Sequence, residues 1–243
     1  MRHFKPVVVC ASTVSSKMLS AIADAEGFQF EETLTGFKWI ASRSRELQTQ
    51  KGYFPLFCYE EAIGFCCGDV VNDKDGLSAM GVMANLANEV YQSDVGNLAN
   101  YLQHLYQKYG YFCSNNGYFF AKEPNIVNNI LDQIRDGGNY CTKVGSYKVK
   151  SIRDLGYPGY DSTTTDRKPI LPVSKSSPMI TIRFENGCVA QFRGSGTEPK
   201  FKYYIELRGK PGIDEGDVKK SLEEMSNVIL EELLKPDTNG LTR

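Results

Sequence analysis

In the first part of the chain, segments with the hydrophobic pattern of buried strands alternate with segments typical of helices. Continuous apolar runs at Pro6–Cys10 and Tyr53–Tyr59 are typical of strands buried on both faces, and Phe28–Glu32 is a shorter strand candidate. We expect a helix in the segment around Trp39–Thr49. Strands that alternate with helices indicate a parallel α/β layer, which we expect to occupy residues 1–110.

Two further helices are predicted before residue 110 from apolar residues at helical spacing. Each should present one apolar stripe to a core. The first stripe consists of Leu77, Met80, Met83, Leu86, Ala87 and Val90. The second consists of Leu98, Leu102, Leu105 and Tyr109.

The pattern changes after Gly110. Met179–Phe184 and Cys188–Arg193 are strand candidates, and the Asn186-Gly187 step between them supplies the positive φ angles of a tight hairpin turn. A third strand, Phe201–Leu207, precedes a final helix. We therefore expect an α+β domain over residues 111–243, in which an antiparallel sheet packs against helices. The apolar face of the final helix consists of Val218, Leu222, Met225, Ile229 and Leu233.

One long stretch of the second domain shows neither pattern. Residues 156–177 are rich in proline, glycine, hydroxyl and charged side chains. Such a composition predicts an exposed loop with little regular structure.

Composition and charge restrict the partners of this protein. The 243 residues include 28 Lys and Arg against 29 Asp and Glu, so no global basic field favours nucleic acid or an anionic membrane. No apolar run approaches the ~20 residues that a membrane span needs. Seven cysteines with no Cys-x-x-Cys pair indicate a reducing compartment. We expect a cytoplasmic protein that binds neither nucleic acid nor membrane.

The segment Arg193–Lys200 has the composition of an anion site. Its sequence, Arg-Gly-Ser-Gly-Thr-Glu-Pro-Lys, offers a planar guanidinium, two hydroxyls and glycines that let backbone N–H groups approach a phosphate. Lys202 adds a second ammonium group. By composition alone, a polar hairpin loop explains these residues equally well.

Three other polar positions fall at the ends of predicted elements. Glu60 follows a buried strand, where open α/β sheets place their ligands, while Thr35 and Lys74 lie in inter-element loops. Together they could bring a carboxylate, a hydroxyl and an ammonium to one rim. Acidic residues such as Glu60 are also common at helix starts. Each of the three positions is therefore weak evidence of a binding site by itself.

The order of these motifs resembles the α-D-phosphohexomutase family. The residues that carry the resemblance are Arg-x-Ser-Gly-Thr-Glu-Pro ahead of a Tyr-x-Glu strand, with Thr-Gly, Glu-Glu and Lys-Asp-Gly before it. The resemblance implies that residues 1–110 form the family's third, sugar-binding domain, truncated at its N-terminus, and residues 111–243 its fourth, phosphate-binding domain. By the same likeness Thr35, Glu60 and Lys74 would contact the sugar. The phosphate would be held by Arg193, Ser195, Gly196, Thr197 and Lys202.

Within the family, Glu-Glu-Ala-Ile-Gly and Ser-Gly-Thr-Glu-Pro-Lys look most like the phosphopentomutase and glucose-1,6-bisphosphate synthase branch. The glucose-specific branch usually has serine where this chain has Ala62. The substrates implied are glucose 1-phosphate, ribose or deoxyribose 1-phosphate and glucose 1,6-bisphosphate, the last also as an activator. A missing hydroxyl would remove one hydrogen bond worth ~0.5–1.5 kcal/mol, which is consistent with a shift toward pentose phosphates.

Two motifs of an intact phosphomutase are absent from the chain. Neither the family's phosphoserine loop nor its Asp-rich Mg²⁺ loop occurs here, and the acidic residues near Lys74 fail the calcium-loop pattern. The resemblance therefore implies the C-terminal part of a phosphoglucomutase or phosphopentomutase, which is an isomerase acting through a bisphosphate intermediate. We expect this chain alone to be inactive.

Two other functions remain open from the sequence. The chain could be a non-catalytic phosphosugar-binding module. A dinucleotide-dependent oxidoreductase ranks far lower, because Ala11–Ser16 lacks the Gly-x-Gly-x-x-Gly spacing.

Overall fold

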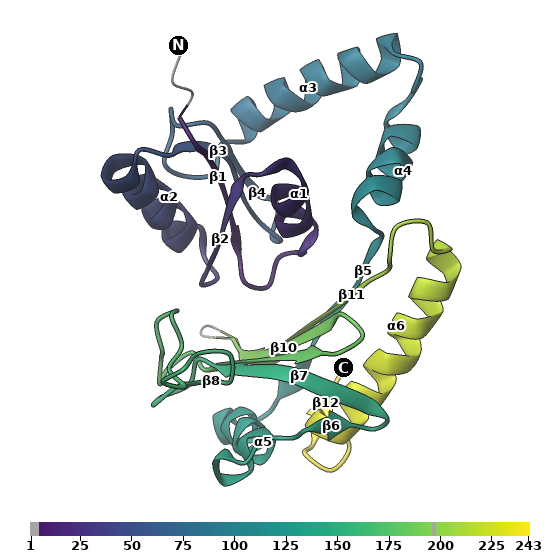
Figure 1. Ribbon diagram of the computed structural model, residues 1–243. Helices are drawn as coiled ribbons and strands as arrows, with labels where there is room; N and C mark the ends of the chain where they lie inside the picture. The colour runs from purple at the N-terminus through teal and green to yellow at the C-terminus, as the bar shows by residue number, and fades with distance from the viewer. Residues whose placement is uncertain (1–4, 196–197) are drawn as a thin grey trace. The chain divides into compact units, whose positions relative to one another are not determined.

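The computed structural model describes residues 5–195 and 198–243 of the chain. It contains two compact units, each with its own sheet and helices (Figure 1). The first unit runs to Tyr111 and includes Lys210–Gly212, and the second comprises Phe112–Gly209 and Ile213–Arg243. An α/β unit followed by an antiparallel α+β unit is the fold class predicted from the sequence.

The first unit is built on a four-stranded sheet in the order β2-β1-β3-β4. β1 pairs in parallel with both β2 and β3, as the alternation of strands and helices predicts. β4 was not predicted and pairs antiparallel with β3. The elements of this unit are β1 (Val7–Ser12), α1 (Met18–Glu26), β2 (Gln29–Thr33), α2 (Phe37–Lys51), β3 (Phe54–Glu60), β4 (Gly64–Cys67), α3 (Gly76–Gln92) and α4 (Leu98–Tyr109).

One face of this sheet packs against α2. Cys10, Cys58 and Cys66 occupy neighbouring positions on β1, β3 and β4 and lie in one buried cluster with Ile40 and Leu47 of α2. All seven cysteines of the chain are free. A hydrogen bond to the Cys58 thiol and burial raise the pKa of Cys10, and burial raises the pKa of Cys66, so these two thiols act as small core side chains.

The apolar stripe predicted for α3 does not pack as expected. Of the residues in this helix, only Val90 is buried, while Leu77, Met80 and Met83 are exposed. The helix contacts β4 and α4 within its unit. The spacing therefore predicts the helix correctly but not a buried stripe.

The second unit is built on a mainly antiparallel sheet in the order β12-β5-β11-β10-β9-β7-β6, with β8 paired to β7. β7 was not predicted. The elements are β5 (Phe112–Ala121), α5 (Pro124–Arg135), η1 (Asp136–Gly138), β6 (Lys143–Val144), β7 (Tyr147–Asp154), β8 (Tyr160–Asp161), β9 (Met179–Phe184), β10 (Cys188–Gly194), β11 (Lys200–Arg208), α6 (Glu215–Ile229), η2 (Leu230–Leu234) and β12 (Leu241–Thr242).

α6 buries the face that its spacing predicts, with one shift at its end. Val218, Met225 and Ile229 are buried, but Leu234 replaces the predicted Leu233 in the core. The reason is that η2 is a π-helical turn, which is wider than an α-turn and advances the buried face by a residue.

The turn between β9 and β10 also differs from the prediction in one detail. A positive φ occurs at Gly187, where φ is 89°, but not at Asn186. The Asn186 side chain instead accepts a hydrogen bond from the Cys188 N–H. The connection is a three-residue loop with glycine in the left-handed position, which is a common alternative to the two-residue turn.

Residues 156–177 form a largely irregular loop, as predicted, with β8 as a short strand in it. Its base is held by Asp154, whose buried carboxylate accepts hydrogen bonds from the Arg135 guanidinium at 2.6 and 3.1 Å and from the Tyr140 hydroxyl at 3.0 Å. The Gly156 N–H donates a further bond at 2.7 Å. Because these hydrogen bonds satisfy the buried Asp154 carboxylate, they fix the backbone at the point where the long loop begins.

Candidate functional site

The carboxyl ends of β1, β2 and β3 lie at one edge of the first sheet because the three strands are parallel. Glu60 ends β3, and Thr35 lies in the loop that follows β2. Both side chains are half-buried. This is the edge at which open α/β sheets place their ligands, so both residues remain candidates for a binding site.

Glu60 and Lys74 pack against the same glycine. A Cβ atom built on Gly64 would lie 2.9 Å from Glu60 Cγ and 2.6 Å from Lys74 Cδ. Lys74 Nζ also lies 5.1 Å from the centroid of the ring of Phe37, a residue two positions after Thr35. The absence of a side chain at position 64 therefore allows Glu60 and Lys74 to lie together on one rim of the first unit.

Glu61 takes a role that the sequence analysis missed. Its carboxylate accepts hydrogen bonds from the hydroxyl groups of Ser12 at 3.0 Å and Ser15 at 3.5 Å, and its N–H donates to Ser15 Oγ at 3.1 Å. Ser12 and Ser15 are themselves buried. Glu61 thus connects the β3–β4 turn next to Glu60 to the β1–α1 loop through hydrogen bonds. In the sequence, the hydroxyl-rich run after β1 was the feature that could have predicted this contact.

The acidic residues around Lys74 serve local structure. A hydrogen bond from the Lys74 N–H, at 2.7 Å, lowers the pKa of Asp73, and the Lys74 ammonium lies 3.2 Å from the same carboxylate oxygen. Asp75 caps α3 by accepting from the Leu77 N–H at 3.0 Å and from the Ser78 hydroxyl. These contacts agree with the interpretation of a solvated loop.

For a magnesium ion, which the family resemblance implies for an intact enzyme, residues 5–195 and 198–243 offer no matching ligand set. Among the residues that the structure describes, no three His, Cys, Asp or Glu side chains converge as metal ligands would. The acidic groups near Lys74 are occupied by the capping and ion-pair contacts above. We therefore derive no metal-dependent step for this chain.

The phosphate-site candidates of the second unit lie on neighbouring strands. Arg193 on β10 is directly opposite Lys202 on β11, so the two side chains project from the same face of the sheet. Both are half-buried. The Ser195 N–H donates to the Lys200 carbonyl at 2.8 Å and closes the start of the loop. Gly196 and Thr197 lie outside the described residues.

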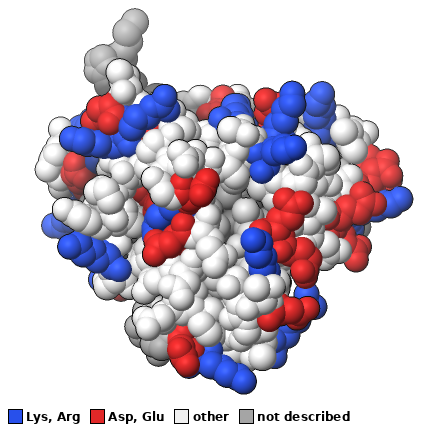
Figure 2. Space-filling model, turned by 90° about the horizontal axis from the view of Figure 1, so that it is seen from below, with Lys and Arg blue, Asp and Glu red and all other residues white. Residues whose placement is uncertain are grey.

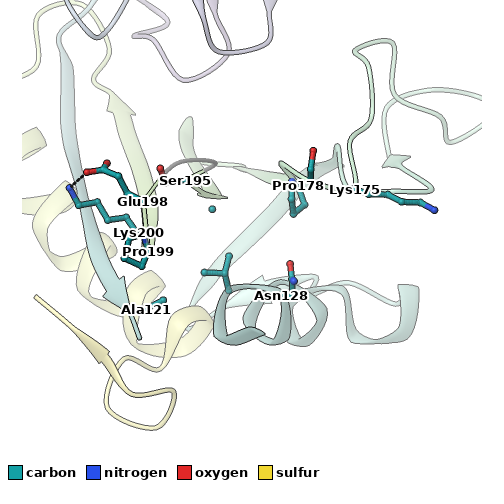
Figure 3. A pocket seen from close by; sticks show the side chains of 11 residues that line it. Ala121, Asn128, Lys175, Pro178, Ser195, Glu198, Pro199 and Lys200 are labelled. Carbon is teal, nitrogen blue, oxygen red and sulfur yellow. Dashed lines mark hydrogen bonds and ion pairs between the residues drawn. The ribbon is translucent and has the colours of Figure 1, made fainter. Parts of the chain in front are cut away.

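A pocket of about 440 Å³ lies beside this loop (Figure 3). Asn128 points into it from α5, and Ser195 and Pro199 border it from the loop side. The Lys200 ammonium bonds Glu198 at 2.9 Å, which raises the pKa of Lys200, and it also lies 4.3 Å from the Tyr118 ring centroid. Lys200 is thus held by its own loop, whereas the Arg193–Lys202 pair supplies positive charge on the sheet.

The face drawn in Figure 2 shows no large field of one sign. On the face drawn in Figure 2, basic and acidic side chains are interspersed, as the net charge of −1 suggests. Any attraction for an anion therefore has to come from local groups such as Arg193 and Lys202. In the described part of the chain, none of the helices is both long and apolar enough to cross a bilayer.

Comparison with known families identifies the first unit. Residues 2–109 match the model described as phosphoglucomutase/phosphomannomutase, alpha/beta/alpha domain III. The chain is 44% identical over 243 residues to the human glucose 1,6-bisphosphate synthase and 44% identical over 241 residues to the human phosphopentomutase. Each alignment covers 98% of this chain, but only 38% and 39% of those relatives.

Solved structures show the same fold at lower identity. The open form of the Paramecium phosphoglucomutase parafusin matches with a TM-score of 0.68 and 16% identity, covering 95% of this chain and 38% of that chain. A putative phosphomannomutase from Thermus thermophilus matches with a TM-score of 0.53, 15% identity and the same coverage. Both likenesses extend through the two units, so the mixed fold is that of phosphoglucomutase-like domains.

Proposed function

Since this chain belongs to the α-D-phosphohexomutase family, we propose that its units act as the family's third and fourth domains and bind a sugar phosphate. The observation that carries the proposal is the packing of Glu60 and Lys74 around Gly64, beside the loop that bears Thr35. Glu60 and Lys74 lie 14 positions apart in the sequence, yet they share one rim. A phosphosugar site needs such a mixed set of acceptors, donors and positive charge.

In the first unit, each candidate has a chemical role. The Glu60 carboxylate accepts hydrogen bonds from sugar hydroxyls and so orients the ring. Lys74 provides an ammonium near the anionic part of the ligand, and its stem is held against Gly64 and Phe37. The Thr35 hydroxyl adds a neutral hydrogen bond. Binding that fixes a substrate in this way lowers the barrier by positioning.

In the second unit, Arg193 and Lys202 neutralise the phosphate, and the loop after Arg193 completes the anion site. The opposed register of the two residues supports this assignment, because it projects both charges from one sheet face. Ser195, Gly196 and Thr197 are proposed to add hydroxyl and backbone N–H donors. Phosphoryl transfer depends on such positioning and charge stabilisation.

The proposed substrates are those of the phosphopentomutase and glucose 1,6-bisphosphate synthase branch. Support comes from the 44% identity to both human relatives and from Ala62, which has no hydroxyl to offer a hexose. In the intact family enzyme, a phosphoserine donates its phosphoryl group to the sugar phosphate, and the bisphosphate returns its other group to the serine. We place the protein in the cytoplasm.

Catalysis by these 243 residues alone is not proposed. The chain contains neither the phosphoserine motif nor the Asp-rich metal motif of the family, and it spans 38% of the length of the human synthase. The alternative function is a phosphosugar-binding module that does not convert its ligand. Both accounts require binding, and they differ only in whether the ligand is turned over when the remaining family domains are present.

Calorimetric titration with glucose 1,6-bisphosphate tests the proposal. We expect saturable 1:1 binding, and Arg193→Ala should weaken it about 10- to 100-fold because a charge-assisted hydrogen bond is worth ~1.5–3 kcal/mol. Lys220→Ala, which removes an exposed charge from α6, is the matched control and should leave the affinity unchanged. No binding by the wild type, or equal losses in both variants, would refute the proposal.

A parallel assay addresses activity. The wild-type chain should not interconvert glucose 1-phosphate and glucose 6-phosphate, or the corresponding ribose phosphates. Measurable turnover would contradict the expected inactivity of the chain but leave the binding site intact.

A further inference from the structure

Another pocket of the second unit lies apart from the phosphate-site candidates. Its volume is about 460 Å³, within the ~300–1,000 Å³ typical of small-molecule sites. It lies between the end of α5, the η1 turn and the start of the 156–177 loop. The described residues that line it include none of those that line the pocket beside Ser195. An inference about this pocket therefore does not rest on sugar phosphate binding.

Three tyrosines, Tyr140, Tyr157 and Tyr160, give this tyrosine pocket its aromatic wall. The rings of Tyr140 and Tyr160 are stacked, with centroids 4.6 Å apart and an angle of 18° between their planes. The Tyr140 hydroxyl donates a hydrogen bond to the buried Asp154 carboxylate, which fixes the stacked pair. Tyr157 is 63% exposed. The pocket thus presents aromatic faces, which carry partial negative charge.

The ionised groups that line the tyrosine pocket leave an excess of negative charge. Arg135 donates through Nε and Nη2 to Asp154 and through Nη1, at 2.7 Å, to Asp132. Among the described lining residues, one guanidinium therefore faces two carboxylates, and the Asp132 side chain is 69% exposed. Burial and the Asp154 charge raise the pKa of Tyr140, so its hydroxyl adds no charge of its own. This environment favours a cation over a phosphate.

Lys175 shows the kind of contact that these rings make. Its ammonium lies 4.3 Å from the centroid of the Tyr157 ring, within the ~6 Å over which a cation–π attraction acts. A metal ion is a poorer match, because the described residues bring no three His, Cys, Asp or Glu side chains together as ligands. Aromatic faces beside a carboxylate are instead typical of sites for organic ammonium groups.

We propose that the tyrosine pocket binds the ammonium group of a small organic cation. The faces of Tyr157 and of the stacked pair provide cation–π contacts, and the exposed Asp132 carboxylate provides the ionic contact. The Lys175 ammonium, already on Tyr157, opposes a second cation at that ring.

Titration of the full chain with tetramethylammonium chloride, followed by amide NMR spectra, tests the proposal. We expect saturable shifts at Gly137, Gly138 and Gly159, which line the pocket, and a dissociation constant in the millimolar range. Sodium chloride at the same ionic strength is the reference. tert-Butanol, a neutral molecule of similar size, should bind at least about fivefold more weakly, because it has no cation–π attraction. Equal binding of tert-butanol would overturn the inference.

Tyr157→Leu should weaken tetramethylammonium binding about fivefold, because it removes one aromatic face from the pocket. Tyr91→Leu, at a 61% exposed position of the first unit, is the matched control and should leave the affinity unchanged. Lys175→Met keeps an unbranched side chain without the charge, and it should tighten binding about two- to threefold. Unchanged affinity in Tyr157→Leu, or weaker binding in Lys175→Met, would overturn the inference.

A second titration with butylammonium chloride, which resembles a lysine side chain, identifies the ammonium group that the pocket prefers. Tighter binding of butylammonium would indicate a primary ammonium, and tighter binding of tetramethylammonium a methylated one. No shift with either cation would overturn the inference.

Glucose 1,6-bisphosphate separates this inference from the proposed function. It should leave the affinity for tetramethylammonium unchanged, and competition between the two would overturn the inference, since the pocket would then belong to the sugar phosphate site. A chain that binds tetramethylammonium but no bisphosphate would refute the proposed function alone.

Discussion

The two candidate sites are built in opposite ways. In the first unit, Glu60 at the end of β3 and Lys74 from the loop after β4 pack around Gly64, while Thr35 lies in the loop after β2. In the second, Arg193 and Lys202 are nine positions apart and face each other across one antiparallel pair. A parallel sheet gathers distant residues, whereas a hairpin presents residues that are already close in sequence. The first site therefore depends more on packing, and the second more on local charge.

The contacts that hold the two candidate sites in place also differ. The rim of the first unit depends on a glycine that leaves room for two side chains and on Glu61, which is bonded to Ser12 and Ser15. The loop of the second unit is closed by the backbone bond from Ser195 to Lys200 and by the ion pair between Lys200 and Glu198. Substitutions that alter shape should affect the first site most, and substitutions that alter donor geometry the second.

Gly64→Ala should have a larger effect than Arg193→Lys or Glu60→Gln. The new Cβ would lie 2.6 Å from Lys74 Cδ and 2.9 Å from Glu60 Cγ, so both side chains have to move. Affinity for glucose 1-phosphate should fall about tenfold, equivalent to ~1.4 kcal/mol, while inorganic phosphate binding is unchanged. Gly81→Ala is the control, because a Cβ at position 81 meets nothing within 4 Å. Titrations in which both variants bind alike would remove the packing argument for the first site.

A smaller effect is expected from Arg193→Lys. The charge stays, but the planar fork of donors that matches a phosphate is lost, and we expect about a fivefold loss of affinity for inorganic phosphate. Lys220→Arg, on the exposed side of α6, should change nothing. Calorimetry at two salt concentrations checks the result, and full affinity in Arg193→Lys would mean that charge alone defines the second site.

The smallest effect is expected from Glu60→Gln. The amide still accepts a hydrogen bond, so only the charge-assisted part is lost, and affinity for glucose 1-phosphate should fall about threefold. Glu89→Gln on α3, an exposed position, serves as the control. If inorganic phosphate binding fell by the same factor, Glu60 would be acting through the overall charge and not through sugar hydroxyls.

Much of the first unit could be predicted because its elements have strong local signals. β1 and β3 contain continuous apolar runs, and α2 ends at Gly52 in the left-handed conformation that glycine favours. β4 and β7 were missed because their patterns are short or mixed. β4 forms a strand by pairing with β3, and β7 by pairing with β9. The sequence of a single segment does not reveal such a pairing partner.

By itself, the sequence determined the α/β and α+β character of the two units, and it suggested the proposed phosphate site, since Arg193–Lys200 is one contiguous segment whose chemistry is readable locally. Only the tertiary structure decided that Glu60 and Lys74 share Gly64, that Glu61 is bonded to Ser12 and Ser15, and that most of the α3 stripe is left exposed. The physical reason is that helical spacing specifies which residues share a face. What covers that face, and which distant side chains meet beside it, depends on strand pairing and packing between elements.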